Sequence, residues 1–120
     1  TLHIGTDTQP HSDSTTLITT ICFREEGHGA VVFYQKRRIQ FFSSIFDRLV
    51  YETVISLEIA DEVKELSGLT PTIHADVNPK QQNLSNRVTD AIIGMITGMG
   101  YPVLIKPNAW AADIADMYTR

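Results

Sequence analysis

The sequence predicts one α/β domain in which three antiparallel strands come first and helices then alternate with single strands. Two observations favour this fold class. The hydrophobic pattern alternates with a strand-like period in the first third of the chain and takes a helical period of about 3.6 residues afterwards. Short, turn-rich segments join the first three strand-like segments. The 120 residues, 42% hydrophobic and 20% charged, have the composition of a single compact domain.

The first three elements have the sequence of strands separated by turns. Residues 2–8 alternate between two faces, as a strand does, and residues 9–14 form a turn by composition. β-branched residues dominate the segment 15–24. A second turn at 25–29 leads into a third strand over 30–38. The two short connections predict an antiparallel meander.

Helices and single strands alternate in the remaining sequence. Ser43 or Ser44 can cap a first helix of about six turns, because a serine hydroxyl accepts a hydrogen bond from the first helical turn. Glycines that can adopt the left-handed conformation follow the first two helices. The predicted elements are, in order, a helix up to Leu66 that ends at Ser67-Gly68, a strand over 71–77, a helix over 85–99 that ends at Gly100, a strand over 101–105, and a last helix capped by Asn108. The expected order is therefore β-β-β-α-β-α-β-α.

Charge and hydropathy argue against two classes of protein. A net charge of -4 and a pI near 5.4 do not suit a domain that coats nucleic acid with a broad basic face. No apolar run is long enough to span a membrane, and the first residues lack the features of a signal peptide, so we expect a cytoplasmic protein. Cys22, the single cysteine, is expected to pack as a small apolar residue. Since strand-like sequence begins at once after Thr1, we interpret residues 1–120 as one domain of a slightly longer chain.

Two aspartates stand at the carboxyl ends of predicted strands, where an apolar residue would suit a core. Asp7 ends the first strand and Asp76 ends the fourth. In α/β sheets, ligands bind outside the carboxyl ends of strands, and neighbouring parallel strands that end in Asp would hold their carboxylates a few ångströms apart. Either aspartate alone would more simply cap its own turn. The two together favour a binding site.

In the first helix, an acid lies within a line of mostly apolar residues. The line follows steps of three and four residues and consists of Ile45, Leu49, Glu52, Ser56, Ile59 and Val63. Glu52 is therefore the candidate site residue of this helix. The alternative is that Glu52 lies at the edge of the line and reaches water.

The last predicted helix carries a pair of acids. Asp113 and Asp116 are three residues apart and share a face with Ala109 and Ala112, whose small side chains allow close packing on the sheet. The alternative is a short exposed helix with two solvated acids. The sequence does not decide which of the two aspartates faces the other candidates.

Four or five converging carboxylates require a compensating cation, because like charges at short range repel and raise each other's pKa. Ligand sets made only of oxygen favour Mg2+ or Mn2+ over zinc, and the sequence has no Cys/His spacing typical of zinc sites. Two such ions about 4 Å apart would activate a water molecule and stabilise the leaving oxygen in phosphodiester hydrolysis. The acids therefore predict a site for two divalent ions.

Three runs of sequence resemble the ribonuclease H-like YkuK family of bacterial proteins: Ile4-Gly5-Thr6-Asp7-Thr8-Gln9, His74-Ala75-Asp76-Val77-Asn78-Pro79, and residues 106–116. The resemblance covers essentially the whole chain and implies a five-stranded mixed sheet in the order 3-2-1-4-5, flanked by helices. In the wider superfamily, acids on the first strand, the first helix, the fourth strand and the last helix bind two metal ions. Asp7, Glu52, Asp76, and Asp113 or Asp116 match these places. The Asp113-x-x-Asp116 pair also resembles the last helix of RuvC-type resolvases.

Basic residues and one histidine are candidates for substrate contact or proton transfer. The basic run Lys36-Arg37-Arg38 could meet substrate phosphates, or could simply be a solvated strand end. Lys80 and Lys106 flank the predicted site on loops. His74 could orient Asp76 or transfer a proton, although a buried, hydrogen-bonded histidine is the more frequent case.

These observations favour a metal-dependent nuclease or resolvase-like phosphodiesterase that acts on RNA, DNA or an RNA-DNA hybrid. Asp7 would bridge the two ions, and Glu52, Asp76 and either Asp116 or Asp113 would complete their ligand shells. The alternative is a non-catalytic domain on the same fold that binds nucleic acid or protein. A third possibility, an ATPase half-domain of the actin type, begins with a similar strand, but this sequence lacks its length and its glycine-rich phosphate loop.

Overall fold

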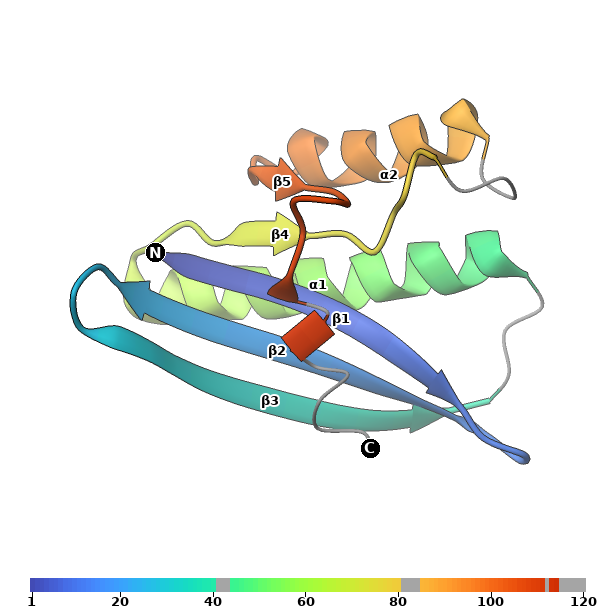
Figure 1. The fold of residues 1–120 in the computed structure, drawn as a ribbon, viewed down its shortest axis with the longest axis horizontal. Coiled ribbons are helices and arrows are strands. Elements are labelled where there is room, and N and C mark those ends of the chain that lie inside the picture. Colours follow the sequence, from blue (N-terminus) through green and yellow to red (C-terminus); the bar gives the residue numbers. More distant parts are fainter. Residues whose placement is uncertain (41–43, 81–84, 112, 115–120) are drawn as a thin grey trace.

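Five strands form one mixed sheet in the order β3-β2-β1-β4-β5, which confirms the expected fold class and strand order (Figure 1). The computed structural model describes residues 1–40, 44–80, 85–111 and 113–114. Within these ranges the elements are β1 (Leu2–Pro10), β2 (Thr15–Glu25), β3 (Gly29–Ile39), α1 (Ile45–Ser67), β4 (Thr72–His74), α2 (Asn86–Gly98) and β5 (Val103–Leu104). The long strands of the meander therefore form most of the sheet.

The central strand, β1, joins the two halves of the sheet. It pairs with β2 in antiparallel fashion along its whole length, and β2 pairs with β3 in the same way. On its other side β1 pairs with β4 in parallel, and the last pair joins Gly5 to His74. After Gly5, β1 continues to Pro10, but no described strand pairs with it on the β4 side.

Helix α1 begins and ends where the sequence predicts. Its N-cap is Ser44, whose hydroxyl accepts a hydrogen bond from the Asp47 backbone N–H at 3.1 Å. Its last turn closes at Gly68, which has a φ of 73° and donates its N–H to the Lys64 carbonyl at 2.8 Å. The predicted line of residues along this helix is buried or half-buried throughout, which confirms the helical periodicity.

The main core lies between one face of the sheet and the two helices. Ile4 of β1 and Ile73 of β4 are adjacent on this face, and both are almost fully buried. They belong to one apolar cluster with Leu49 of α1 and with Ile92 and Ile96 of α2. Because successive residues of a strand face opposite sides, His74 lies on the other face of the sheet. Cys22 is buried, as expected.

The strands β4 and β5 are shorter than predicted. β4 ends at His74 rather than near residue 77, and β5 spans only two residues. Beyond His74 the backbone pairs with the end of β5 and the segment after it instead of with β1. Ala75 donates its N–H to the Leu104 carbonyl at 2.9 Å, and the Val77 carbonyl accepts from the Lys106 N–H at 3.0 Å. Local composition does not reveal this change of partner.

The last helical segment begins later than predicted. Asn108 is not its cap, because Asn108 lies in a preceding turn and the first helical residue is Ala111. In the described part of this segment, residues 111, 113 and 114 are helical, and the Trp110 carbonyl accepts hydrogen bonds from the Asp113 and Ile114 N–H groups. The expected final helix is therefore described only at its start.

His74 caps this segment from β4. Its Nδ1 accepts hydrogen bonds from the backbone N–H groups of Trp110 and Ala111, at 3.0 and 3.3 Å. Such N–H groups at the start of a helix have no partner within the helix itself. Because Nδ1 accepts, the ring proton lies on Nε2, which donates to His3 Nδ1 at 2.9 Å. The Trp110 ring packs against both imidazoles, with centroid distances of 4.6 and 4.7 Å.

The neutral form of His74 is strongly favoured. Burial, and secondarily the charge on His3, lower the pKa of His74 from 6.5 to about 4. Burial, the amino terminus and Arg24 also lower the pKa of His3. A protonated His74 could not accept hydrogen bonds at Nδ1 and would release the Trp110 and Ala111 N–H groups.

The contribution of His74 to the free energy of unfolding is therefore expected to fall as the pH drops from about 6.5 toward 4. In this window the unfolded chain protonates His74 while the folded chain does not, so protons favour the unfolded state, by about 3 kcal/mol at most. His74→Asn keeps an oxygen acceptor near the Nδ1 position and does not titrate, so its free energy of unfolding relative to that of the wild type should rise as the pH falls through this window. Urea unfolding followed by circular dichroism between pH 4 and 7.5 measures this effect.

The matched control is His28→Asn, which removes an exposed histidine from the β2–β3 turn. This variant should keep the wild-type dependence on pH. An unchanged slope in His74→Asn would show that the His74 cap does not contribute to the acid sensitivity of the fold.

Candidate metal centre

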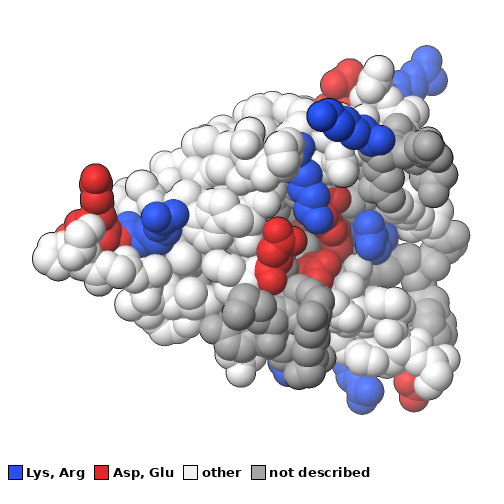
Figure 2. All heavy atoms as spheres, in the orientation of Figure 1, with Lys and Arg blue, Asp and Glu red and all other residues white. Residues whose placement is uncertain are grey.

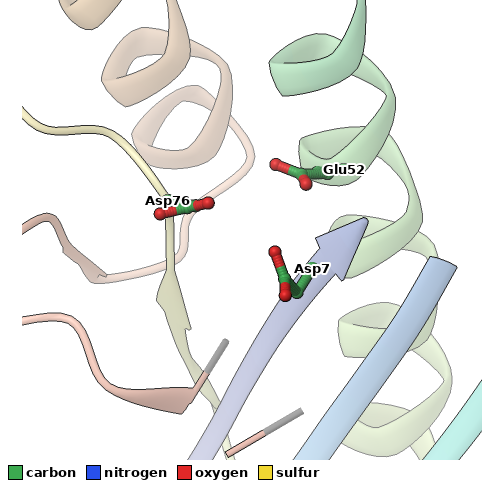
Figure 3. A group of neighbouring side chains, drawn as sticks. All are labelled: Asp7, Glu52 and Asp76. Atoms are coloured by element: carbon green, nitrogen blue, oxygen red, sulfur yellow. The ribbon is translucent and has the colours of Figure 1, made fainter. Parts of the chain in front are cut away.

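Three carboxylates converge beside the end of the β1–β4 pairing. Asp7 of β1, Glu52 of α1 and Asp76, in the segment after β4, each offer an oxygen atom, and these oxygens all lie within 4.8 Å of one another. Figure 3 shows the three side chains pointing toward one another from these separate segments. The structure thus brings together the expected acids of the first strand, the first helix and the fourth strand.

Strand register explains why the two aspartates meet. Gly5 and His74 form the last pair between β1 and β4, and Asp7 and Asp76 each follow that pair by two residues. Parallel strands in register carry such positions on the same side at neighbouring places. Because the chain after β4 no longer pairs with β1, the Glu52 side chain of α1 can also reach the space between Asp7 and Asp76.

A buried hydroxyl contact places α1 along β1. The Thr6 Oγ1 atom lies 2.7 Å from Ser56 Oγ and 3.0 Å from Thr19 Oγ1 on β2. Glu52 precedes Ser56 by four residues, one helical turn, and Asp7 follows Thr6 directly. The contact between Thr6 and Ser56 therefore places the Glu52 carboxylate beside the Asp7 carboxylate.

Glu52 is buried, so the alternative that it reaches water is wrong. It is 4% exposed, and among the described residues neither carboxylate oxygen has a hydrogen-bond partner. Burial raises the pKa of Glu52 to about 8, and the Asp76 and Asp7 carboxylates add to this rise. The Arg48 guanidinium opposes it, as does the nearby Thr8 side chain, whose contact with the carboxylate lacks the geometry of a normal hydrogen bond. A cavity of about 10 Å³ adjoins Glu52 and Asp76, which is roughly the room that one buried water molecule needs.

Lys106 forms an ion pair with one of these acids. Its Nζ atom lies 2.9 Å from Asp76 Oδ1 and 3.8 Å from Asp113 Oδ1. The hydrogen bond to Asp76 raises the pKa of Lys106, and the charges of Asp76, Asp113 and Asp7 reinforce this effect against the cost of burial. Figure 2 shows acidic side chains near the centre of this face with basic side chains beside them.

Of the two candidate acids in the last predicted helix, the structure describes only Asp113. Asp113 lies beside Lys106, its side chain is 66% exposed, and it is not one of the three converging acids. Asp116 lies outside the described residues. The fourth acid of the expected set thus stays a prediction.

The basic run lies on the exposed edge strand β3. The register places Lys36 opposite Ile18 and Ile18 opposite Asp7, so Lys36 and Asp7 share one face of the sheet, two strands apart. Arg38 follows Lys36 on that face, whereas Arg37 points to the opposite face. Lys80 is exposed in the loop after Asp76. The role of these side chains in substrate binding stays a prediction.

His74 does not take the position in the site that was expected of it. Both of its ring nitrogens are engaged by His3 and by the backbone of the last helical segment, and no hydrogen bond joins it to Asp76. The sequence prediction missed the ion pair between Lys106 and Asp76, and it missed His3 as the partner of His74. The contact between His3 and His74 did have a signal in the sequence, because each histidine lies on the same face of one of two neighbouring parallel strands.

Replacing Glu52 by Gln should stabilise the metal-free protein at pH 8.5 and change little at pH 4.5. The raised pKa means that folding favours the protonated carboxyl, so the charge of Glu52 costs stability increasingly from pH 4.5 to about 8. The gain should reach a few kcal/mol at most. Urea unfolding in the presence of a chelator measures it.

Glu58→Gln is the matched control, because Glu58 is exposed on the same helix. Its effect should be small and should not grow over this pH range. A loss of stability in Glu52→Gln at pH 8.5 would show that the buried carboxylate is compensated in the metal-free protein.

Comparison with known proteins agrees with the observed fold. The whole chain, residues 1–120, matches the family model described as Ribonuclease H-like. The chain is also similar to the uncharacterized protein YkuK of Bacillus subtilis (strain 168). The two sequences are 27% identical over an alignment of length 137, gaps included, which covers 99% of this chain and 78% of that protein. No solved structure matches the chain. No helix within the described ranges is long and apolar enough to cross a membrane. The chain belongs to the ribonuclease H-like family.

Proposed function

We propose that this domain is a divalent-metal-dependent nuclease that hydrolyses phosphodiester bonds in RNA, DNA or an RNA-DNA hybrid. The observation that carries the proposal is the convergence of Asp7, Glu52 and Asp76, with both Glu52 oxygens buried and unpartnered among the described residues. A buried carboxylate without a partner is costly, and a cation that binds it removes this cost. The family membership supports the same conclusion.

The residues fit a hard divalent ion. All three candidate ligands are carboxylates, which suit Mg2+ or Mn2+ better than zinc or copper. Their oxygens already lie within 4.8 Å of one another, so the three ligands converge before an ion binds. When bound, Mg2+ or Mn2+ supplies Lewis-acid catalysis at a phosphodiester.

The residues of the chain have distinct roles in this proposal. Asp7, Glu52 and Asp76 would hold the divalent ions, and Asp7 is the candidate for a ligand shared by two of them. Asp113 or Asp116 completes the ligand set from the last helix. Nucleic acid is the proposed partner, and its phosphates would contact basic side chains near the acids, for which the candidates are Lys36, Arg37, Arg38, Lys80 and Lys106.

Asp7→Asn should abolish both metal-dependent stabilisation and metal-dependent cleavage. Millimolar Mn2+ should raise the melting temperature of the wild type by several degrees, because an ion that binds only the folded state stabilises it. The variant should show no such rise, and its cleavage rate should fall by about 100-fold or more. Thermal melts with Mg2+ or Mn2+, followed by cleavage assays on labelled RNA, DNA and hybrid substrates, measure both effects.

Asp90→Asn is the control, since Asp90 is an exposed acid on α2 with the same change of charge. It should keep the metal response of the wild type. Full activity in Asp7→Asn would refute the proposed centre. Metal binding without cleavage of any substrate would instead favour the alternative of a non-catalytic binding domain.

A further inference from the structure

Lys106 places its positive charge at one edge of the acidic cluster. The Lys106 ammonium contacts Asp76 at 2.9 Å, and the Asp113 carboxylate lies 3.8 Å away from it. The side chains of Lys106, Asp76 and Asp113 are 35%, 17% and 66% exposed. The lysine therefore lies between a half-buried acid of the proposed metal centre and an acid that faces solvent.

The backbone around Lys106 is held in place, whereas its side chain has two possible acceptors. The Lys106 N–H donates to the Val77 carbonyl at 3.0 Å, which joins this residue to the segment that carries Asp76. The following turn closes through hydrogen bonds from the Asn108 and Ala109 N–H groups to the Ile105 carbonyl, each at 2.9 Å. A rotation of the lysine side chain alone can therefore transfer the ammonium from one carboxylate to the other.

We propose that Lys106 is a displaceable counter-charge: it neutralises Asp76 in the metal-free protein and moves to Asp113 when a divalent ion binds to the Asp7, Glu52 and Asp76 carboxylates. This inference rests on the proposed function, in the form in which Asp113 is not itself a metal ligand. An ammonium group and a divalent ion that share one carboxylate repel each other at this range. Asp113 is exposed, so it can accept the ammonium with little loss of hydration.

The proposal makes Lys106 a competitor of the metal. Removing the ammonium should tighten metal binding, although most substitutions beside a binding site weaken it. The transfer to Asp113 further requires that the effect of Asp113 on metal affinity depend on Lys106. Both statements concern binding of the metal alone, so they can be tested without a nucleic-acid substrate.

The test is a titration with Mn2+ in which free Mn2+ is followed by electron paramagnetic resonance. Lys106→Met should lower the Kd for Mn2+ about tenfold, while Lys106→Arg, which keeps the charge, should leave it within about twofold of the wild type. Lys64→Met is the matched control for net charge, since Lys64 lies near the far end of α1 beside Tyr101. It should leave the Kd unchanged.

Asp113→Asn tests the second half of the proposal. In the wild-type background it should raise the Kd about threefold, because the displaced ammonium loses its second acceptor. In the Lys106→Met background it should have no effect. An equal effect in both backgrounds would identify Asp113 as a direct metal ligand and would overturn the transfer.

The remaining outcomes separate this inference from the proposed function. If the wild type binds Mn2+ and Glu52→Gln does not, an unchanged or raised Kd in Lys106→Met overturns the role of Lys106 and leaves the metal centre intact. If neither the wild type nor Lys106→Met binds Mn2+, both proposals fail. Should Lys106→Met not fold, Lys106→Gln, which can still donate a hydrogen bond to Asp76, carries the same expected decrease in Kd.

Discussion

The position of α1 on the sheet depends on one buried contact, in which the Thr6 hydroxyl of β1 meets the Ser56 hydroxyl of the helix at 2.7 Å. Apolar packing holds the helix against the sheet, but it tolerates small shifts along the strand direction. Buried hydroxyls need hydrogen-bond partners, and the Thr6–Ser56 pair forms only at one position of the helix along the strand, so it favours one register. That register brings Glu52 beside Asp7. Without the contact, the helix could cover the same apolar surface and leave its acid away from the other two.

The acidic cluster is stable only because the surrounding fold holds the three acids together. A 4% exposed carboxylate beside two further acids lowers stability at neutral pH, since burial and like charges both favour its protonated form. The main core of Ile4, Ile73 and their neighbours supplies the stability that offsets this cost. An electrostatic cost of this kind is typical of sites that bind a ligand. The ion pair of Lys106 with Asp76 relieves part of it in the metal-free state.

Strand β4 connects the core, the cap and the site within a few residues. Ile73 packs in the core, His74 accepts hydrogen bonds from the last helical segment on the opposite face, and Asp76 enters the acidic cluster. The alternation of strand residues predicted that His74 and Asp76 point to one side. It could not predict the partners of His74, because those belong to Trp110, Ala111 and β1, which approach only in the folded chain.

The sequence by itself determined the fold class, the order of the elements, the limits of α1 and the line of buried residues on which Glu52 lies, because these follow from local periodicity and from capping residues such as Ser44 and Gly68. It also identified Asp7 and Asp76 as unusual strand-end acids. Only the tertiary structure decided that β4 ends at His74, that Asn108 is not a helix cap, and that Lys106 pairs with Asp76. These features depend on which segments meet in space, and the energy that selects them comes from contacts between residues far apart in the chain.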